Sequence, residues 1–364
     1  MAGRGSRRER LGLTGALRTA ALDLLACPRD HTALELTGGD GGEIADGALR
    51  CAEGHRFEIR EGVPRLAPEE SAGGDSQEGT FESFSAKWAQ VSSEELEQRF
   101  AQQYEWYVER YGFGDEEGLA EFLSGREAIL EAGTGLGGDA ARFARLSEAQ
   151  VVGLDLSEGV VKAQRHFGGP ENLHYVQGDI LELPFRPVSF DFISSDQVIH
   201  HTPDAPGAFA RLAERLRPGG HLAVYVYREK AMLRELADTR VREITTRMSP
   251  EECMEFSEQV TELGRELSRL GATVNLEKGV PLLGIDPGEH DVQRLIHWTF
   301  LKCFWNDDFS EHLNALVNFD WYHPPYASRH TPDEVRGWCE RAGLGVEHLD
   351  VSESGISVLA RRPA

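Results

Sequence analysis

The sequence predicts an α/β fold, in which a doubly wound, seven-stranded and mostly parallel sheet is joined by a small N-terminal ribbon domain and a helical cap. Between residues 126 and 227, short apolar runs of strand length alternate with runs of helix length. A strand that continues through a helix returns parallel to its predecessor, with a right-handed crossover. Near the C-terminus two further strand-like runs follow one another directly, which predicts an antiparallel pair.

The core elements follow from apolar runs, helix caps and glycines. The closing helix, for example, has Thr331 as its N-cap, Pro332 at its first position and Gly343 at its end. In chain order the expected elements are strand 128–132, helix 138–146, strand 151–155, helix 159–167, strands 173–177 and 190–194, helix 205–216, strand 221–227, helix 331–343 and strands 346–351 and 356–361.

Glycines at alternate positions follow the first strand. Gly133, Gly135 and Gly137 stand directly after Glu131, and a good helix sequence comes next. A chain that leaves a buried parallel strand and turns at once into a helix needs backbone angles that a Cβ forbids. Glycines also let a ligand approach the main chain, and the helix N-terminus presents free N–H groups. This turn is therefore the predicted centre of a ligand site.

An acidic residue ends the second expected strand. Asp155 lies 24 residues after Glu131. In α/β folds a carboxylate at this place, about 20 residues past the glycines, holds a nucleoside ribose through two hydrogen bonds. We therefore expect the ligand to carry a ribose.

Together with motifs further along the chain, this pattern resembles the class I S-adenosylmethionine (SAM) methyltransferases, in particular the ubiquinone-biosynthesis C-methyltransferases. The resemblance covers residues 126–227, resumes at 331–361, and implies SAM as the cofactor. It is carried by Glu131-x-Gly133-x-Gly135-x-Gly137, Gly178-Asp179-Ile180, Leu183-Pro184-Phe185, Phe190-Asp191-Phe192, His200-His201 and Leu216-Arg217-Pro218-Gly219-Gly220. The residues expected to bind SAM are Glu131, Gly133, Thr134, Gly135, Gly137, Asp155, Leu156, Asp179, Ile180 and Asp196.

A dinucleotide-binding domain is the alternative for this core. Its motif Gly-x-Gly-x-x-Gly also fits, because Gly138 stands at the third position, so glycine spacing alone does not separate the two. Asp179 separates them, since a carboxylate after the third strand suits an adenine amino group and has no standard dinucleotide role. The joint pattern favours SAM.

Two short knuckles lie within residues 21–66 and contain Cys27, Cys51 and His55. Tight turns of this kind present ligands to tetrahedral zinc. The layout resembles the zinc ribbon that precedes some methyltransferases, including rRNA guanine methyltransferases. Asp30 stands where that pattern has its second cysteine. The expected zinc ligands are thus Cys27, Asp30, Cys51 and His55, and the alternative is a ribbon that has lost its metal.

The remaining segments surround the core. We expect a disordered tail at 1–20, the ribbon at 21–66, a linker at 67–80, a helical lid at 81–125, the SAM-binding core at 126–227 and 331–364, and a helical cap at 228–330. The residues expected to contact the acceptor are Trp88, Gln197, Asp320, Tyr322 and Tyr326. The candidates for a catalytic base are His200, His201, Tyr322 and His323, for which packing is the alternative role.

The composition excludes several functions. A net charge of −23 repels phosphate backbones and anionic lipid, which disfavours nucleic acid as a partner. No run of 18 apolar residues occurs, so no membrane span is expected. The five scattered cysteines form no disulfide framework, which together with SAM favours the reducing cytoplasm. Nothing in the composition predicts an oligomeric state.

We therefore predict a SAM-dependent methyltransferase that acts on a small molecule. Direct displacement at an activated methyl group needs an aligned acceptor and the exclusion of water, so this chemistry leaves no fixed catalytic motif. One alternative is the use of another part of SAM, as in aminocarboxypropyl transfer or azetidine-2-carboxylate formation with release of methylthioadenosine. Others are an rRNA methyltransferase and a catalytically idle adaptor.

Overall fold

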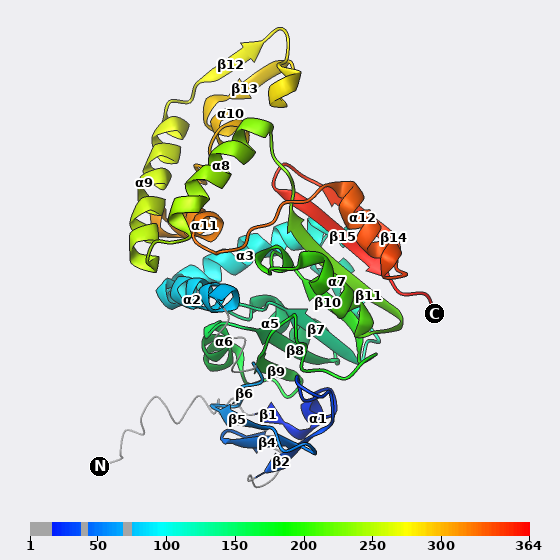
Figure 1. The fold of residues 1–364 in the computed structure, drawn as a ribbon. Coiled ribbons are helices and arrows are strands. Elements are labelled where there is room, and N and C mark those ends of the chain that lie inside the picture. The colour runs from blue at the N-terminus through cyan, green and yellow to red at the C-terminus, as the bar shows by residue number, and fades with distance from the viewer. Residues whose placement is uncertain (1–16, 38–42, 68–74) are drawn as a thin grey trace, which may run out of the picture.

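The central sheet has seven strands and the predicted doubly wound topology (Figure 1). The computed structural model describes residues 17–37, 43–67 and 75–364. Five neighbouring strands are parallel, and β15 is antiparallel to both of its neighbours. The fold-class prediction is confirmed. Across the sheet the order is β14 (Gly345–Val351), β15 (Gly355–Arg361), β11 (Leu216–Tyr227), β10 (Phe190–Ser195), β7 (Ala128–Ala132), β8 (Gln150–Asp155) and β9 (Leu173–Gln177).

Alternate residues of the strands pack on opposite faces of the sheet. Ile129 and Val151 belong to a buried cluster with the helices of one face, whereas Leu130 and Val152 belong to the cluster of the other face. The first face is covered by α3 (Ser93–Arg110), α4 (Glu116–Leu123), α5 (Gly138–Leu146) and α6 (Gly159–Phe167), the second by α7 (Ala205–Glu214) and α12 (Pro332–Arg341).

The N-terminal ribbon completes the second face at the β9 edge. Residues 178–189, which join β9 to β10, contain no helix, and the ribbon packs there instead. Ala26 N–H donates to the Pro184 carbonyl at 2.9 Å, and Leu66 N–H donates to the Gln177 carbonyl at 2.8 Å. Its elements are β1 (Leu17–Arg18), α1 (Thr19–Leu22), β2 (Leu34–Thr37), β3 (Glu43–Ile44), β4 (Gly47–Cys51), β5 (Arg56–Arg60) and β6 (Val63–Pro64).

The lid begins earlier than the sequence predicts. Helix α2 (Asp75–Gln90) starts inside the expected linker 67–80, so the linker prediction is wrong for residues 75–80. Its C-terminal half is anchored, because Lys162 donates to the carbonyl of Trp88 at 2.6 Å. A tertiary contact of this kind cannot be predicted from the local sequence pattern. Of the predicted tail and linker, residues 1–16 and 68–74 lie outside the described residues. The predicted tail is wrong for residues 17–20, which form β1 and the start of α1.

The insertion 228–330 forms the cap at the opposite end of the molecule from the ribbon (Figure 1). Four helices agree with the predicted helical cap, but a hairpin of two short strands interrupts them. Four-residue strands carry too little periodicity to be predicted. The cap consists of α8 (Met232–Thr245), α9 (Pro250–Arg269), β12 (Thr273–Leu276), β13 (Gly288–Asp291), α10 (Val292–Thr299) and α11 (Glu311–Tyr322).

Two buried asparagines on α11 fix the coil that follows α10. Asn318 accepts from the Phe304 N–H at 2.9 Å and donates to the Thr261 hydroxyl at 2.8 Å. Asn314 accepts from the Asn306 N–H at 2.8 Å and donates to its carbonyl at 3.0 Å. These amides satisfy main-chain groups that no helix or strand pairs.

Replacing Asn318 by Ala should therefore loosen the cap. We expect the free energy of unfolding to fall by about 1–3 kcal/mol, because buried donors and acceptors lose their partners. Hydrogen exchange should accelerate in residues 300–310, and Asn275→Ala, at an exposed position, should leave exchange unchanged. Equal exchange in the two variants would contradict the assigned role.

Candidate functional site

The turn between β7 and α5 brings the main chain to the carboxyl edge of the sheet. Gly133, Gly135 and Gly137 have φ values of +90°, +55° and +82°. A Cβ on Gly133 would lie 2.3 Å from the side chain of Val198, so no larger residue fits there. The N–H of Gly133 donates to the Leu154 carbonyl at 2.7 Å, which ties the turn to β8.

The buried Glu131 and the half-buried Asp155 shape this turn. Glu131 accepts from the Thr134 hydroxyl at 2.5 Å and from the Ala140 N–H at 2.7 Å. Asp155 accepts from the Gly135 N–H at 2.7 Å. Burial raises the pKa of both carboxyl groups. Hydroxyl or ammonium donors from a ligand would therefore stabilise their anionic forms.

These residues line a cavity of about 140 Å³ at the place where open α/β sheets bind ligands. The lid closes one side of it with Phe84 and Trp88, and the cap contributes Asp320 from α11. Most of the predicted site residues come together here. The cavity is lined by Trp88, Glu131, Gly133, Thr134, Gly135, Asp155, Leu156, Asp179, Ile180, Asp196, Gln197, His201 and Asp320.

Gly137 is the exception among the predicted cofactor residues. It does not line the cavity, and its carbonyl accepts from the Tyr175 hydroxyl at 2.8 Å. A Cβ at this position would lie 2.6 Å from the Ala163 Cβ and from the Tyr175 hydroxyl oxygen. The glycine is thus needed for close packing beneath the loop, and the predicted ligand contact is corrected.

Asp196 and Gln197 extend from β10 over the cavity. Arg110 donates to both carboxylate oxygens of Asp196 at 3.0 Å, and the Tyr111 hydroxyl donates to one of them at 2.8 Å. Gln197 has a φ of +62°, which is unusual for a residue with a side chain. Strained backbone of this kind clusters at ligand sites.

Of the adjacent histidines His200 and His201, only His201 lines the cavity. Its Nδ1 donates to the Tyr326 carbonyl at 2.8 Å, which leaves Nε2 as an acceptor, and burial lowers its pKa to about 4. His200 is buried with its ring centroid 3.8 Å from that of Tyr227, and burial lowers its pKa well below the ordinary value. The structure does not bring His200 and Tyr326 to the lining of this cavity.

Tyr322 and His323 are also held away from the cavity. The Tyr322 hydroxyl donates to the Lys302 carbonyl at 2.8 Å. The ring of His323 lies between the Ser83 hydroxyl, at 2.8 Å, and the Met248 carbonyl, at 3.2 Å. The Tyr322 hydroxyl thus bonds within the cap and His323 joins the cap to α2, so the structure does not place these two predicted residues at the cavity.

Lys87 is a lining residue that the sequence analysis missed. It is 2% exposed, and its ammonium lies 2.7 Å from the Asp320 carboxylate. The pair joins the lid to the cap across the cavity. Lys87 could have been predicted from its position next to Trp88, because that segment was expected to cover the cofactor.

A larger cavity of about 470 Å³ adjoins the first one. The two share Gln103, Gln197 and Asp320 as lining residues. The larger cavity extends from this boundary between α3, the cap and the β14–β15 edge. Its volume falls in the range of small-molecule sites.

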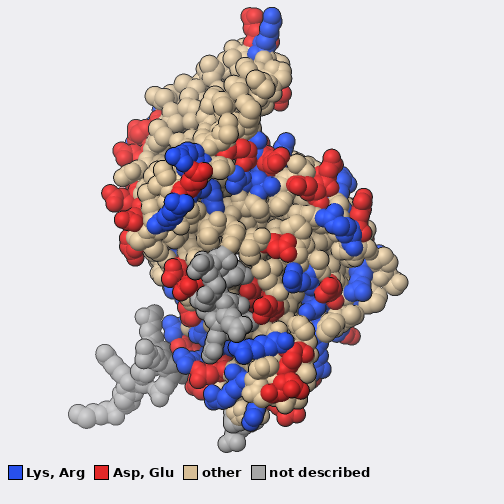
Figure 2. All heavy atoms as spheres, viewed as in Figure 1, with Lys and Arg blue, Asp and Glu red and all other residues tan. Residues whose placement is uncertain are grey.

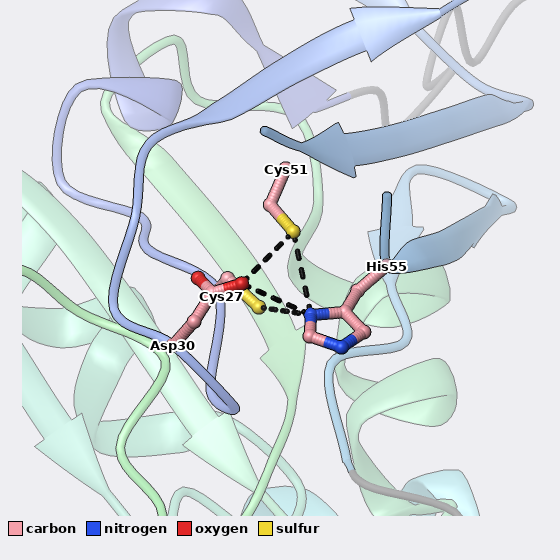
Figure 3. A group of neighbouring side chains, drawn as sticks. All are labelled: Cys27, Asp30, Cys51 and His55. Carbon is pink, nitrogen blue, oxygen red and sulfur yellow. Dashed lines mark hydrogen bonds and ion pairs between the residues drawn. The ribbon is translucent and has the colours of Figure 1, made fainter. Parts of the chain in front are cut away.

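The four predicted metal ligands converge in the ribbon (Figure 3). His55 Nδ1 lies 3.5 Å from Cys27 Sγ, 3.4 Å from Cys51 Sγ and 3.0 Å from Asp30 Oδ2. Ligand atoms on tetrahedral zinc are about 3.3–3.8 Å apart, as the bond lengths require. The distances from His55 Nδ1 to the two sulfurs fall in this range, whereas the Asp30 oxygen lies closer to His55 Nδ1. Thr32 donates to the other oxygen of Asp30 from its N–H, at 2.9 Å, and its hydroxyl, at 2.6 Å, and so orients the carboxylate.

The strand order, the glycine turn and the carboxylate at the end of β8 are features of the class I SAM-dependent methyltransferase fold. In agreement, residues 130–224 match the methyltransferase domain family. No helix in the described part of the chain is both long enough and apolar enough to cross a membrane.

Known relatives resemble the chain over its core. The sterol 24-C-methyltransferase of Candida albicans is 29% identical over 101 residues, 27% of each chain. That of Yarrowia lipolytica is 32% identical over 101 residues, 27% of this chain and 26% of the relative. The match therefore spans about a quarter of these relatives.

Solved structures resemble a longer part of the chain. A SAM-dependent methyltransferase from Mesorhizobium loti covers 68% of this chain and 99% of its own at 17% identity, with a TM-score of 0.41. Magnesium protoporphyrin IX methyltransferase from Synechocystis PCC 6803, with bound S-adenosylhomocysteine (SAH), covers 69% and 83% at 13% identity, with a TM-score of 0.36.

Substitution of Gly133 by Ala should distort the wall of the cavity. The new Cβ would collide with Val198, and overpacking of this kind costs about 1–3 kcal/mol. We expect the affinity for SAH to fall by about 5- to 150-fold on that scale, as measured by calorimetry. Gly219→Ala is the matched control, because Gly219 has a φ of +78° but nothing within 4 Å of its Cβ position. If both variants bind SAH like the wild type, the steric requirement is refuted.

Proposed function

We propose that the protein transfers the methyl group of SAM to a small-molecule acceptor. The observation that carries this proposal is one cavity in which the glycine turn, Asp155 and Asp179 meet beneath the lid and the cap. In this assignment Asp155 holds the ribose, Asp179 and Ile180 face the adenine, and the turn at Gly133 and Gly135 faces the methionine part.

The transfer itself needs little acid–base help. The sulfonium already activates the methyl group, so the protein must align the acceptor, exclude water and, for a protonated acceptor, accept one proton. His201 lines the cavity, its buried Nε2 has no hydrogen-bond partner, and its low pKa keeps it neutral at pH 7. We therefore assign the proton-accepting position to His201 and the alignment to the lid and the cap.

The charges on the surface of the molecule support a small-molecule acceptor. Cationic and anionic residues are interspersed over the face visible in Figure 2, and the net charge of −23 opposes binding to nucleic acid. The five cysteines are free, in keeping with our proposal of a cytoplasmic location.

The role of Asp155 can be tested with SAH. Asp155→Ala should weaken SAH binding by about 1–3 kcal/mol, because the ribose loses its hydrogen-bond acceptors and the loop loses its contact at Gly135. Calorimetric titration measures this, and Asp333→Ala, at an exposed position on α12, should bind like the wild type. Unchanged affinity in Asp155→Ala would remove the assigned ribose contact.

We further propose that the ribbon binds one zinc ion through Cys27, Asp30, Cys51 and His55. The spacing of the ligand atoms, within 4.8 Å of one another, supports this proposal. A zinc ion would cross-link the two knuckles and stabilise the ribbon against the sheet.

The purified protein should accordingly contain about one zinc ion per chain. Cys51→Ser should lose the metal and melt at a lower temperature, whereas Cys339→Ser, a buried free cysteine of α12, should keep it. Elemental analysis and thermal unfolding measure both effects. A metal-free wild type whose melting temperature does not respond to added zinc or to chelator would refute the zinc proposal.

A further inference from the structure

Lys302 is a buried lysine in the wall of the larger cavity. It is 9% exposed. Its ammonium lies 5.1 Å from the ring centroid of Trp321 and 5.9 Å from that of Phe304. Within the described parts of the chain no carboxylate oxygen forms an ion pair with it, and burial lowers its pKa to about 7 although the Asp320 and Asp238 carboxylates act in the opposite direction. A buried ammonium group without a carboxylate in direct contact destabilises a fold, so its retention calls for a functional reason.

Lys230 lines the same cavity and is half-buried. It donates to the carbonyls of Glu353 at 2.9 Å and Ser354 at 2.6 Å, and in the described chain it has no ion pair with a carboxylate. Burial, followed by Arg234 and Lys302, lowers its pKa to about 6. The other lysine and arginine side chains in the wall are balanced: Arg110 by Asp196, Arg234 by Asp238 and Arg294 by Glu353.

Much of the remaining wall is aromatic. The rings come from α3, the end of β11, α10, the coil after it and α11. Flat apolar molecules pack well against such surfaces. The principal rings are Trp106, Tyr225, Trp298, Phe304, Phe309 and Trp321.

We propose that the larger cavity is the acceptor site and that it selects a planar, apolar molecule bearing a carboxylate, which pairs with Lys302 and Lys230. This inference rests on the proposed function, which requires an acceptor beside the SAM cavity. A carboxylate bound there would supply the missing counter-charge and favour the protonated forms of both lysines.

The position of the lysines also orients the acceptor. Gln103, Gln197 and Asp320 form the boundary with the SAM cavity, whereas Lys230 and Lys302 line only the larger cavity. An acceptor held by its carboxylate at the lysines directs its other end toward that boundary. Orientation of this kind is the main contribution that a methyltransferase makes to the rate.

The test compares acids with their uncharged amides on full-length protein. Two pairs serve as probes: 6-hydroxy-2-naphthoate with its carboxamide, and indole-3-acetate with its acetamide. By calorimetry the wild type should bind at least one acid about tenfold or more tightly than its amide. Lys302→Met should lose this preference and melt at an equal or higher temperature, since a buried charge has been removed. Lys302→Arg should retain part of it.

Lys278→Met is the matched control, because Lys278 is an exposed residue of the same cap, and it should keep the full preference. Equal binding of acid and amide by the wild type, no binding of either acid, or an unchanged preference in Lys302→Met would overturn the inference. SAH binding is measured separately in each variant. Failure of the wild type to bind SAH refutes the proposed function, whereas a wild type that binds SAH but does not prefer the acids to their amides refutes only the acceptor assignment.

Discussion

The site depends on hydrogen bonds that the carboxylates of Glu131 and Asp155 accept from the glycine turn and the start of α5. Glu131 and Asp155 accept main-chain N–H groups at 2.7 Å from Ala140 and Gly135, and both also line the cavity. The same oxygens that fix the shape of the turn therefore determine which ligand donors can enter. Because burial raises the pKa of these groups, a ligand rich in hydroxyl groups fits better than an anion.

The ribbon contributes to the packing of the sheet, whereas the cap contributes residues to both cavities. The ribbon packs where the connection between β9 and β10 contains no helix, and its apolar residues share one buried cluster with Val152 and Phe185. It is thus part of the sheet's packing. The cap brings Asp320 to the first cavity and Lys302 to the second, and Asn318 holds the coil that carries Lys302.

The sheet and the glycine turn were predictable because their signals are local. Apolar periodicity locates the strands, and the turn at Gly133 admits only glycine. The local sequence does not show which side of a helix faces a cavity. Asp320 and Tyr322 are about 200° apart on α11, so one lines the cavity and the other bonds to the Lys302 carbonyl. Lys302 follows α10 in a coil positioned by tertiary contacts, and no sequence period marks it.

A crystal structure of the complex with SAH tests most directly whether the glycine turn forms a SAM site that delivers its methyl group to the acceptor cavity. The ribose hydroxyls should lie within hydrogen-bond distance of Asp155, and the sulfur should point toward the boundary formed by Gln197 and Asp320. Density for the nucleoside away from Asp155, or a sulfur directed away from that boundary, would contradict this arrangement.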